Sequence, residues 1–146
     1  VMVDTAEAGV SGKPIPQPDP ITEPFWEATR QGRLVIQYCP ACALYIHAPK
    51  VMCTRCASES LEMREVSGKG TVYCFTTVRD VATRGFEPPY IVAFIELAEQ
   101  KGLIYLTNLV QVSPENVRMG MPVEVTWERL AEGWLMPMFR PVRGAA

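Results

Sequence analysis

The sequence has little of what a self-sufficient enzyme needs. Among its 146 residues there is one histidine, His47, and it lies between two cysteine pairs. A Ser-His-Asp triad would have to use this side chain, and we expect it instead to pack in a short hairpin or lie at the surface. No glycine-rich phosphate loop is present, because residues 67–70 (SGKG) are too short a match for a Walker motif. The carboxylates are scattered singly, so the sequence predicts no catalytic site of its own.

Excess charge and long apolar runs are also missing. The formal net charge is -2, and residues 69–146 hold eight Lys/Arg and eight Asp/Glu. A dedicated nucleic-acid binder usually carries a basic patch, so this balance argues against one. No apolar run approaches the length of a membrane span, and the first residues lack the layout of a signal peptide. We therefore expect a cytoplasmic protein with no membrane association.

The chain is expected to divide into three parts. Residues 1–21 contain alternating prolines and predict a flexible tail. Residues 22–67 should form a short helix plus a metal ribbon, and residues 68–146 a β-barrel domain. Thr22 is expected to cap the helix over residues 22–31.

Strand-like patterns dominate the rest of the sequence. Alternating apolar residues predict strands at 33–38 and 61–66, on either side of the cysteine pairs. Five further runs are rich in β-branched and aromatic residues: 71–78, 90–97, 103–110, 122–130 and 134–142. The segment SPEN, at 113–116, should form one helical turn before the fourth run. The fold class is therefore mainly β, with a five-stranded OB-fold barrel favoured over a small sandwich.

Four cysteines form the strongest motif. Cys39 and Cys42 make one Cys-x-x-Cys pair, and Cys53 and Cys56 make a second pair ten residues later. Thiolates at this spacing are the ligands Zn²⁺ prefers in closed structural sites, so we expect one structural Zn²⁺ per chain in a rubredoxin-like zinc ribbon. A thioredoxin-type redox motif would need a βαβ context that the chain does not offer, and a disulfide pairing is disfavoured in a reducing cytosol.

Iron is compatible with the same four sulfurs. Alanine follows each pair, at Ala43 and Ala57, where rubredoxin-like knuckles often carry glycine, and this departure slightly weakens an electron-transfer role. Four thiolates leave no open coordination position, so the metal cannot act as a Lewis acid. The fifth cysteine, Cys74, is expected in the core.

Two segments are candidates for contacts with a partner or an acyl ligand. The helix carries Phe25 and Trp26, which could pack on the chain's own core or on another subunit. The loop at 82–90 is apolar and stiff, and it joins two barrel strands where OB folds often bind. Its candidate contact residues are Arg84, Phe86, Pro88 and Tyr90.

Several stretches together carry a family resemblance. FWEATRQGRLVIQYCPAC, the second cysteine pair, VSGKGTVYCFTTV, PPYIVAFIEL and NVRMGMPVEV occur in this order over residues 22–142. They resemble the acyl-CoA-associated family with an N-terminal rubredoxin-like zinc ribbon and a C-terminal OB-fold. Fold alone does not establish function.

The resemblance implies a division of labour. Members accompany thiolase-like proteins or hydratase-like subunits, and one branch pairs with aldolases (retro-aldol lyases) that cleave steroid side-chain acyl-CoA thioesters. Catalytic residues then lie on the thiolase-like chain, while the ribbon/OB chain stabilises it and borders the CoA route. In such a complex we expect the ribbon and its preceding helix to dock on the partner. Arg84, Lys101 or Arg118 of the barrel are candidates to meet CoA phosphates, although solvated surface charge is the default role of such residues. The rival interpretations are a single-stranded nucleic-acid binder and a small electron carrier.

Overall fold

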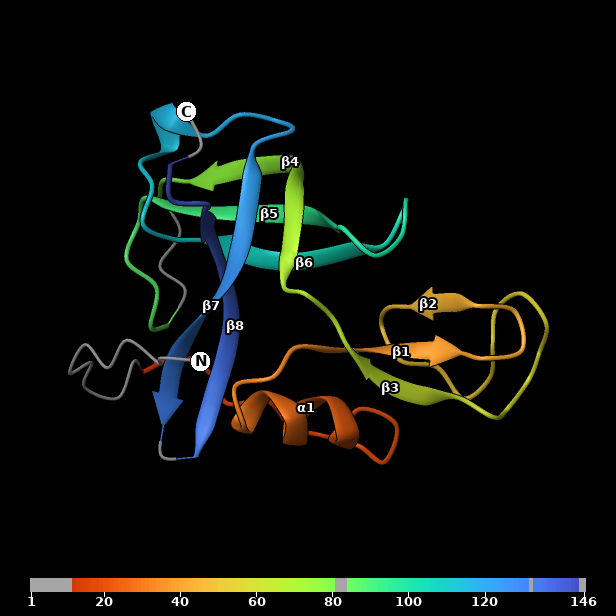
Figure 1. The fold of residues 1–146 in the computed structure, drawn as a ribbon. Coiled ribbons are helices and arrows are strands. Elements are labelled where there is room, and N and C mark those ends of the chain that lie inside the picture. The colour runs from red at the N-terminus through yellow and green to blue at the C-terminus, as the bar shows by residue number, and fades with distance from the viewer. Residues whose placement is uncertain (1–11, 81–83, 132, 145–146) are drawn as a thin grey trace.

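The computed structural model describes residues 12–80, 84–131 and 133–144. A three-stranded ribbon lies on one side, a five-stranded barrel on the other, and one helix runs beneath the two (Figure 1). The helix is α1 (Glu23–Arg30). The ribbon strands are β1 (Val35–Cys39), β2 (Leu44–Ile46) and β3 (Glu62–Glu65), and the barrel strands are β4 (Lys69–Val78), β5 (Tyr90–Leu97), β6 (Ile104–Leu109), β7 (Pro122–Ala131) and β8 (Trp134–Pro141).

The barrel has the strand order of an OB-fold. Its order is β4-β5-β6-β8-β7, and β4 closes the barrel by pairing with β7. All pairings are antiparallel except β6 with β8, which is parallel and is registered only at Leu109–Phe139. A single 3-10 turn, Pro114–Asn116, precedes β7. The five barrel strands, the helical turn and the mainly β fold class are thus confirmed.

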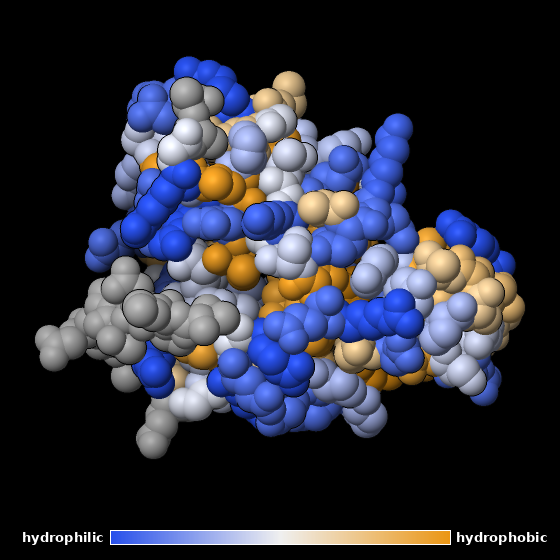
Figure 2. All heavy atoms as spheres, viewed as in Figure 1, coloured by the Kyte–Doolittle hydropathy of each residue, from blue (hydrophilic) through white to orange (hydrophobic). Residues whose placement is uncertain are grey.

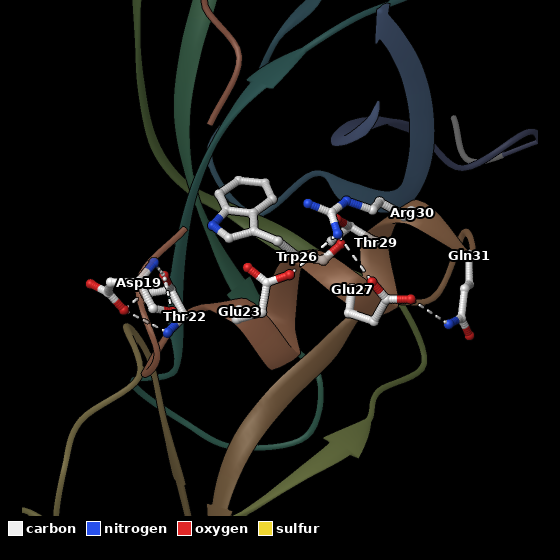
Figure 3. A network of polar contacts seen from close by, with 8 residues as sticks. All are labelled: Asp19, Thr22, Glu23, Trp26, Glu27, Thr29, Arg30 and Gln31. Atoms are coloured by element: carbon white, nitrogen blue, oxygen red, sulfur yellow. Dashed lines mark hydrogen bonds and ion pairs between the residues drawn. The ribbon is translucent and has the colours of Figure 1, made fainter. Parts of the chain in front are cut away.

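The start of α1 matches the predicted position but not the predicted hydrogen bonding. Thr22 makes no side-chain cap bond. Instead, the Asp19 carboxylate accepts a hydrogen bond from the backbone N–H of Thr22 at 2.8 Å (Figure 3). It also accepts one from the backbone N–H of Ile21 at 2.9 Å. Hydrogen bonds to the Asp19 carboxylate lower its pKa. The largest contribution comes from the Thr22 backbone N–H, and the next from the Thr22 side chain. Thr22 therefore occupies the N-cap position, as predicted, but no side-chain bond from Thr22 caps the helix, and the Asp19 carboxylate closes the turn that precedes it.

Exposed polar pairs lie on the outer side of α1, where the surface is mainly hydrophilic (Figure 2). Arg30 bridges Glu23 at 3.2 Å and Glu27 at 3.1 Å, and Gln31 donates to Glu27 (Figure 3). Such exposed pairs contribute little individually. The helix is therefore held mainly by its buried side, formed by Phe25, Ala28 and Thr29.

Helix, ribbon base and barrel share one hydrophobic core. Phe25 of α1 and Ile36 of β1 belong to the same buried cluster as Ile95 and Phe139 of the barrel. A separate small cluster surrounds Cys39, Ile46 and Cys53 at the far end of the ribbon. The ribbon is thus anchored at its base by the barrel core and at its tip by the cysteine cluster.

The sequence predicts Cys74 in the core, and this prediction is wrong. It is half-buried, and β4 has a bulge between Val72 and Cys74. The bulge adds one residue, Tyr73, and shifts the inside–outside alternation of the strand. Residues 1–11 of the expected tail and residues 82–83 of the expected contact loop lie outside the described residues. Within the described part, none of the helices has the length and apolar character needed to cross a bilayer.

Candidate metal centre and ribbon–barrel junction

Two tight turns present the four cysteines to one another. Cys39 ends β1 and Cys42 precedes β2, while Cys53 and Cys56 lie in the long connection to β3. After the second pair, the Ala57 N–H donates to the Cys53 carbonyl at 3.0 Å. Ala43 and Ala57 have φ values of 53° and 59°, a left-handed conformation that costs an L-residue about 1–2 kcal/mol. Alanine therefore occupies two positions where the local backbone favours glycine.

The sulfur positions fit one tetrahedral ion. The four Sγ atoms lie within 4.8 Å of one another. The Cys39–Cys56 pair is 3.6 Å apart and the Cys42–Cys53 pair 3.5 Å apart. A tetrahedral ion with Zn–S bonds of about 2.3 Å requires sulfurs about 3.8 Å apart, whereas a disulfide requires about 2.05 Å. The geometry matches a shared metal and excludes cystines among these four residues.

Backbone N–H groups favour the thiolate form of one cysteine, Cys53, whereas burial and the neighbouring thiols raise the pKa of Cys42. The backbone N–H groups of Cys56 and Arg55, with the neighbouring thiols, lower the pKa of Cys53 to about 6. The Arg55 N–H lies 3.4 Å from the Cys53 sulfur. Hydrogen bonds to the charged form of a group lower its pKa. The cluster is therefore a candidate metal centre with one thiolate available near neutral pH.

Gln100 joins the ribbon to the barrel. It lies in the turn between β5 and β6, and its side-chain amide contacts the outer edge of β2. Its Oε1 accepts from the Tyr45 N–H at 2.9 Å, and its Nε2 donates to the Tyr45 carbonyl at 3.1 Å. Two bonds to one residue imitate the pairing of a neighbouring strand. The barrel therefore covers the edge strand of the ribbon.

His47 lies at the same junction, just beyond β2. Its ring is 4.9 Å from the Tyr105 ring and 6.2 Å from the Phe25 ring. Burial lowers the pKa of His47 and raises the pKa of Tyr105. The histidine thus packs at the ribbon hairpin between helix and barrel, which is one of the positions the sequence suggested.

The two helix aromatics have different environments. Phe25 is only 5% exposed and lies in the core shared with the barrel. Trp26 is half-buried, with its ring 4.9 Å from Phe25 and 6.3 Å from Trp134 of β8. Phe25 therefore offers no surface to a partner, whereas Trp26 retains part of its surface.

The loop before β5 contacts the chain's own N-terminal segment. The Phe86 and Tyr90 rings lie 5.0 Å apart. Lys13 places its Nζ 4.5 Å from the centre of the Phe86 ring and forms an ion pair with Glu128 at 2.8 Å. Arg84 and Pro88 are exposed beside these residues. The segment beginning at residue 12 therefore covers part of this candidate contact loop.

The candidate phosphate contacts do not converge. Arg84 precedes β5 and Lys101 follows it, and a strand of this length separates its ends by roughly 25 Å. Arg118 is exposed in a hollow of about 390 Å³, where its guanidinium donates to the carbonyls of Glu115 and Val117. Lys101 lines a different hollow, of about 470 Å³. These residues cannot form one phosphate site within this chain.

Family models match both halves of the chain. Residues 26–62 match the model described as "ChsH2, rubredoxin-like zinc ribbon domain", and residues 63–128 match "ChsH2, C-terminal OB-fold domain". A solved structure titled "Ltp2-ChsH2(DUF35) aldolase" superposes with a TM-score of 0.81 and 35% identity, covering 87% of this chain and 98% of that one. The chain belongs to the ChsH2 (DUF35) family.

Relatives of this family member are described as subunits or scaffolds. A "Probable enoyl-CoA hydratase alpha subunit" of Thermomonospora curvata is 40% identical over 80% of this chain, which spans only 36% of that relative. A "DUF35 domain-containing scaffold protein" of Methanocaldococcus jannaschii is 35% identical, with 64% and 67% of the two chains covered. The "Benzoylsuccinyl-CoA thiolase subunit BbsA" of Geobacter metallireducens is 42% identical over 33% of this chain and 32% of BbsA.

Sequence reasoning missed two features of this ChsH2-family chain. Gln100 lies in a polar turn, and nothing in the sequence indicates that it contacts Tyr45, 55 residues away. Exposed Tyr73, Phe94 and Leu106 fall within runs that were read only as strands. Strict alternation along β5 could have indicated that Phe94 faces outward, since Ala93 and Ile95 on either side of it are buried.

Proposed function

We propose that this chain is a non-catalytic accessory subunit that binds and stabilises a thiolase-like acyl-CoA enzyme. The observation that carries the proposal is the likeness to the ChsH2(DUF35) aldolase structure, of which the chain covers 98%. Relatives described as a thiolase subunit and a hydratase alpha subunit support the same role. In its finer form, the partner is a retro-aldol lyase of steroid side-chain degradation, and this chain borders the access route of the CoA substrate. A hydratase-like subunit or domain can belong to the same assembly.

The metal has a structural role in this proposal. The four cysteine sulfurs hold one Zn²⁺, which supplies a rigid crosslink between the two turns and keeps no open coordination position. The metal would thus fix the tip of the ribbon. The hydrophobic core shared with α1 and the Gln100–Tyr45 contact fix the base of the ribbon. The chain then presents one rigid shape to its partner.

Copurification and coexpression test the proposal together. A tagged chain isolated from its native host should retain a thiolase-like subunit identified by mass spectrometry. Coexpression of that subunit with this chain should raise the subunit's soluble yield and its acyl-CoA turnover. A partner that is fully soluble and active alone would overturn the accessory role, as would the absence of any thiolase-like protein in the isolate.

A metal assay tests the cofactor separately. Elemental analysis of protein purified under reducing conditions should give one zinc per chain. If the protein instead contains one iron per chain and is red, the metal would have a role in electron transfer and not a structural role. Metal-free protein with an ordered ribbon would refute the metal centre.

A further inference from the structure

Three large side chains with apolar surface are exposed on adjacent strands, on the outside of the barrel. Tyr73, Phe94 and Leu106 are 59%, 42% and 57% exposed. They come from the adjacent strands β4, β5 and β6, and Phe94 is paired directly with Leu106. The bulge of β4 places Tyr73 between Val72, which pairs with Ile95, and Cys74, which pairs with Phe94. We call these three residues the outer barrel patch.

The patch is set by the strand pattern and not by loose packing. Tyr105 and Thr107, on either side of Leu106, are buried, as are the two neighbours of Phe94. Phe94 and Leu106 therefore face outward by strand alternation, and Tyr73 is exposed at the bulge of β4. An exposed aromatic and aliphatic cluster costs roughly 25 cal/mol for each Å² of apolar surface left in water. Clusters of this kind, with tyrosine and phenylalanine at the centre, are typical of protein interfaces.

Beside one end of the patch lie two lysines and one carboxylate, so positive charge is in excess there. Thr71 and Glu96 are paired two residues along β4 and β5 from the patch, and they line the hollow of about 470 Å³ together with Lys69 and Lys101. Glu96 accepts a hydrogen bond from the Gly102 N–H at 2.9 Å. Within residues 12–80, 84–131 and 133–144, neither lysine forms an ion pair. A surface that complements this one has an apolar centre with acidic side chains at one end.

We infer that the outer barrel patch, with Lys69 and Lys101 at its end, is the docking surface for the thiolase-like subunit of the proposed function, on which this inference rests. A nucleic acid would need cations along the whole strand path, and the patch has them at one end only. A second copy of this chain would bring its own lysines and not the acidic side chains that complement them. The partner therefore presents an apolar segment with carboxylates at one end.

Cys74 supplies a native reporter for this surface. It is half-buried at the bulge, opposite Phe94, while the other four cysteines belong to the metal cluster. In the complex of the full chain with its copurified subunit, alkylation of Cys74 by iodoacetamide, followed by peptide mass spectrometry, should slow roughly tenfold or more. The variants Phe94→Ser and Leu106→Ser should each weaken the complex roughly tenfold or more, as central interface residues do.

Matched variants separate docking from folding. Val51 and Met119 are 63% and 72% exposed and lie outside the patch, so Val51→Ser and Met119→Ser should change affinity less than about twofold. All four variants should keep the wild-type melting temperature, because each alters an exposed side chain. The double variant Lys69→Glu/Lys101→Glu should weaken the complex and reduce its dependence on salt.

The outcomes that overturn the inference are distinct from failure of the proposed function. If the complex forms, but Phe94→Ser and Leu106→Ser bind normally and Cys74 reacts at its free rate, the surface is wrong and the accessory role stands. If wild-type chain binds no thiolase-like subunit, both fail. Protection of Cys74 by a single-stranded oligonucleotide, or by concentration-dependent dimerisation, would assign the patch to those occupants instead.

Discussion

Replacing Gln100 with alanine should loosen the ribbon from the barrel. The change removes both hydrogen bonds to Tyr45, at 2.9 and 3.1 Å, and leaves one donor and one acceptor of a half-buried strand edge without a protein partner. Each unpaired backbone group costs about 1–3 kcal/mol when water is excluded. Since Tyr45 is only half-buried, we expect the low end for each, or about 2 kcal/mol in total.

Two assays check this prediction. The melting temperature should fall by about 4–8 °C, the shift expected for about 2 kcal/mol in a domain of this size. Hydrogen exchange at the Tyr45 amide should accelerate selectively. The control Gln17→Ala, at an exposed position of the segment before α1, should leave both values unchanged. A Gln100→Ala protein with wild-type melting and unchanged Tyr45 exchange would refute the reasoning.

Other substitutions test the metal centre and the junction. Cys42→Ser should abolish stoichiometric zinc and unfold the ribbon, whereas Cys74→Ser should retain zinc, as measured by elemental analysis and circular dichroism. Ala43→Gly should raise the unfolding free energy by about 0.5–1 kcal/mol, because glycine relieves the left-handed strain, while Ala41→Gly should lower it; denaturant titration compares them. Burial lowers the pKa of His47 in the folded state, so below the unfolded pKa of about 6.5 the unfolded chain binds more protons. Stability should therefore fall as pH drops from about 7 through the folded pKa, and less so in His47→Gln.

Much of this fold follows from local patterns in the sequence. The runs of β-branched and aromatic residues predict the barrel strands closely; 90–97, for example, coincides with β5. The Cys-x-x-Cys spacing predicts which four sulfurs come together, and the structure places them within 4.8 Å. Both patterns involve residues that are close together in the chain, so they can be recognised without knowledge of tertiary contacts.

Long-range contacts and local irregularities were not predictable in the same way. Phe25 has the same hydrophobic character whether it faces a partner or the core, and only the fold shows that it contacts Tyr105. The bulge at Tyr73 depends on how β4 pairs with β5, so alternation alone misplaced Cys74. The Asp19 carboxylate closes a turn just before the helix, and a search for a single capping residue does not detect this turn.

If this chain is a zinc-binding subunit of a thiolase-like enzyme, native mass spectrometry of the assembly isolated from the host should detect both proteins together. We expect a hetero-oligomer that contains the thiolase-like subunit and this chain, with one zinc ion for each copy of the chain. A chain that is isolated without a thiolase-like companion, or that is metal-free within the assembly, would contradict it.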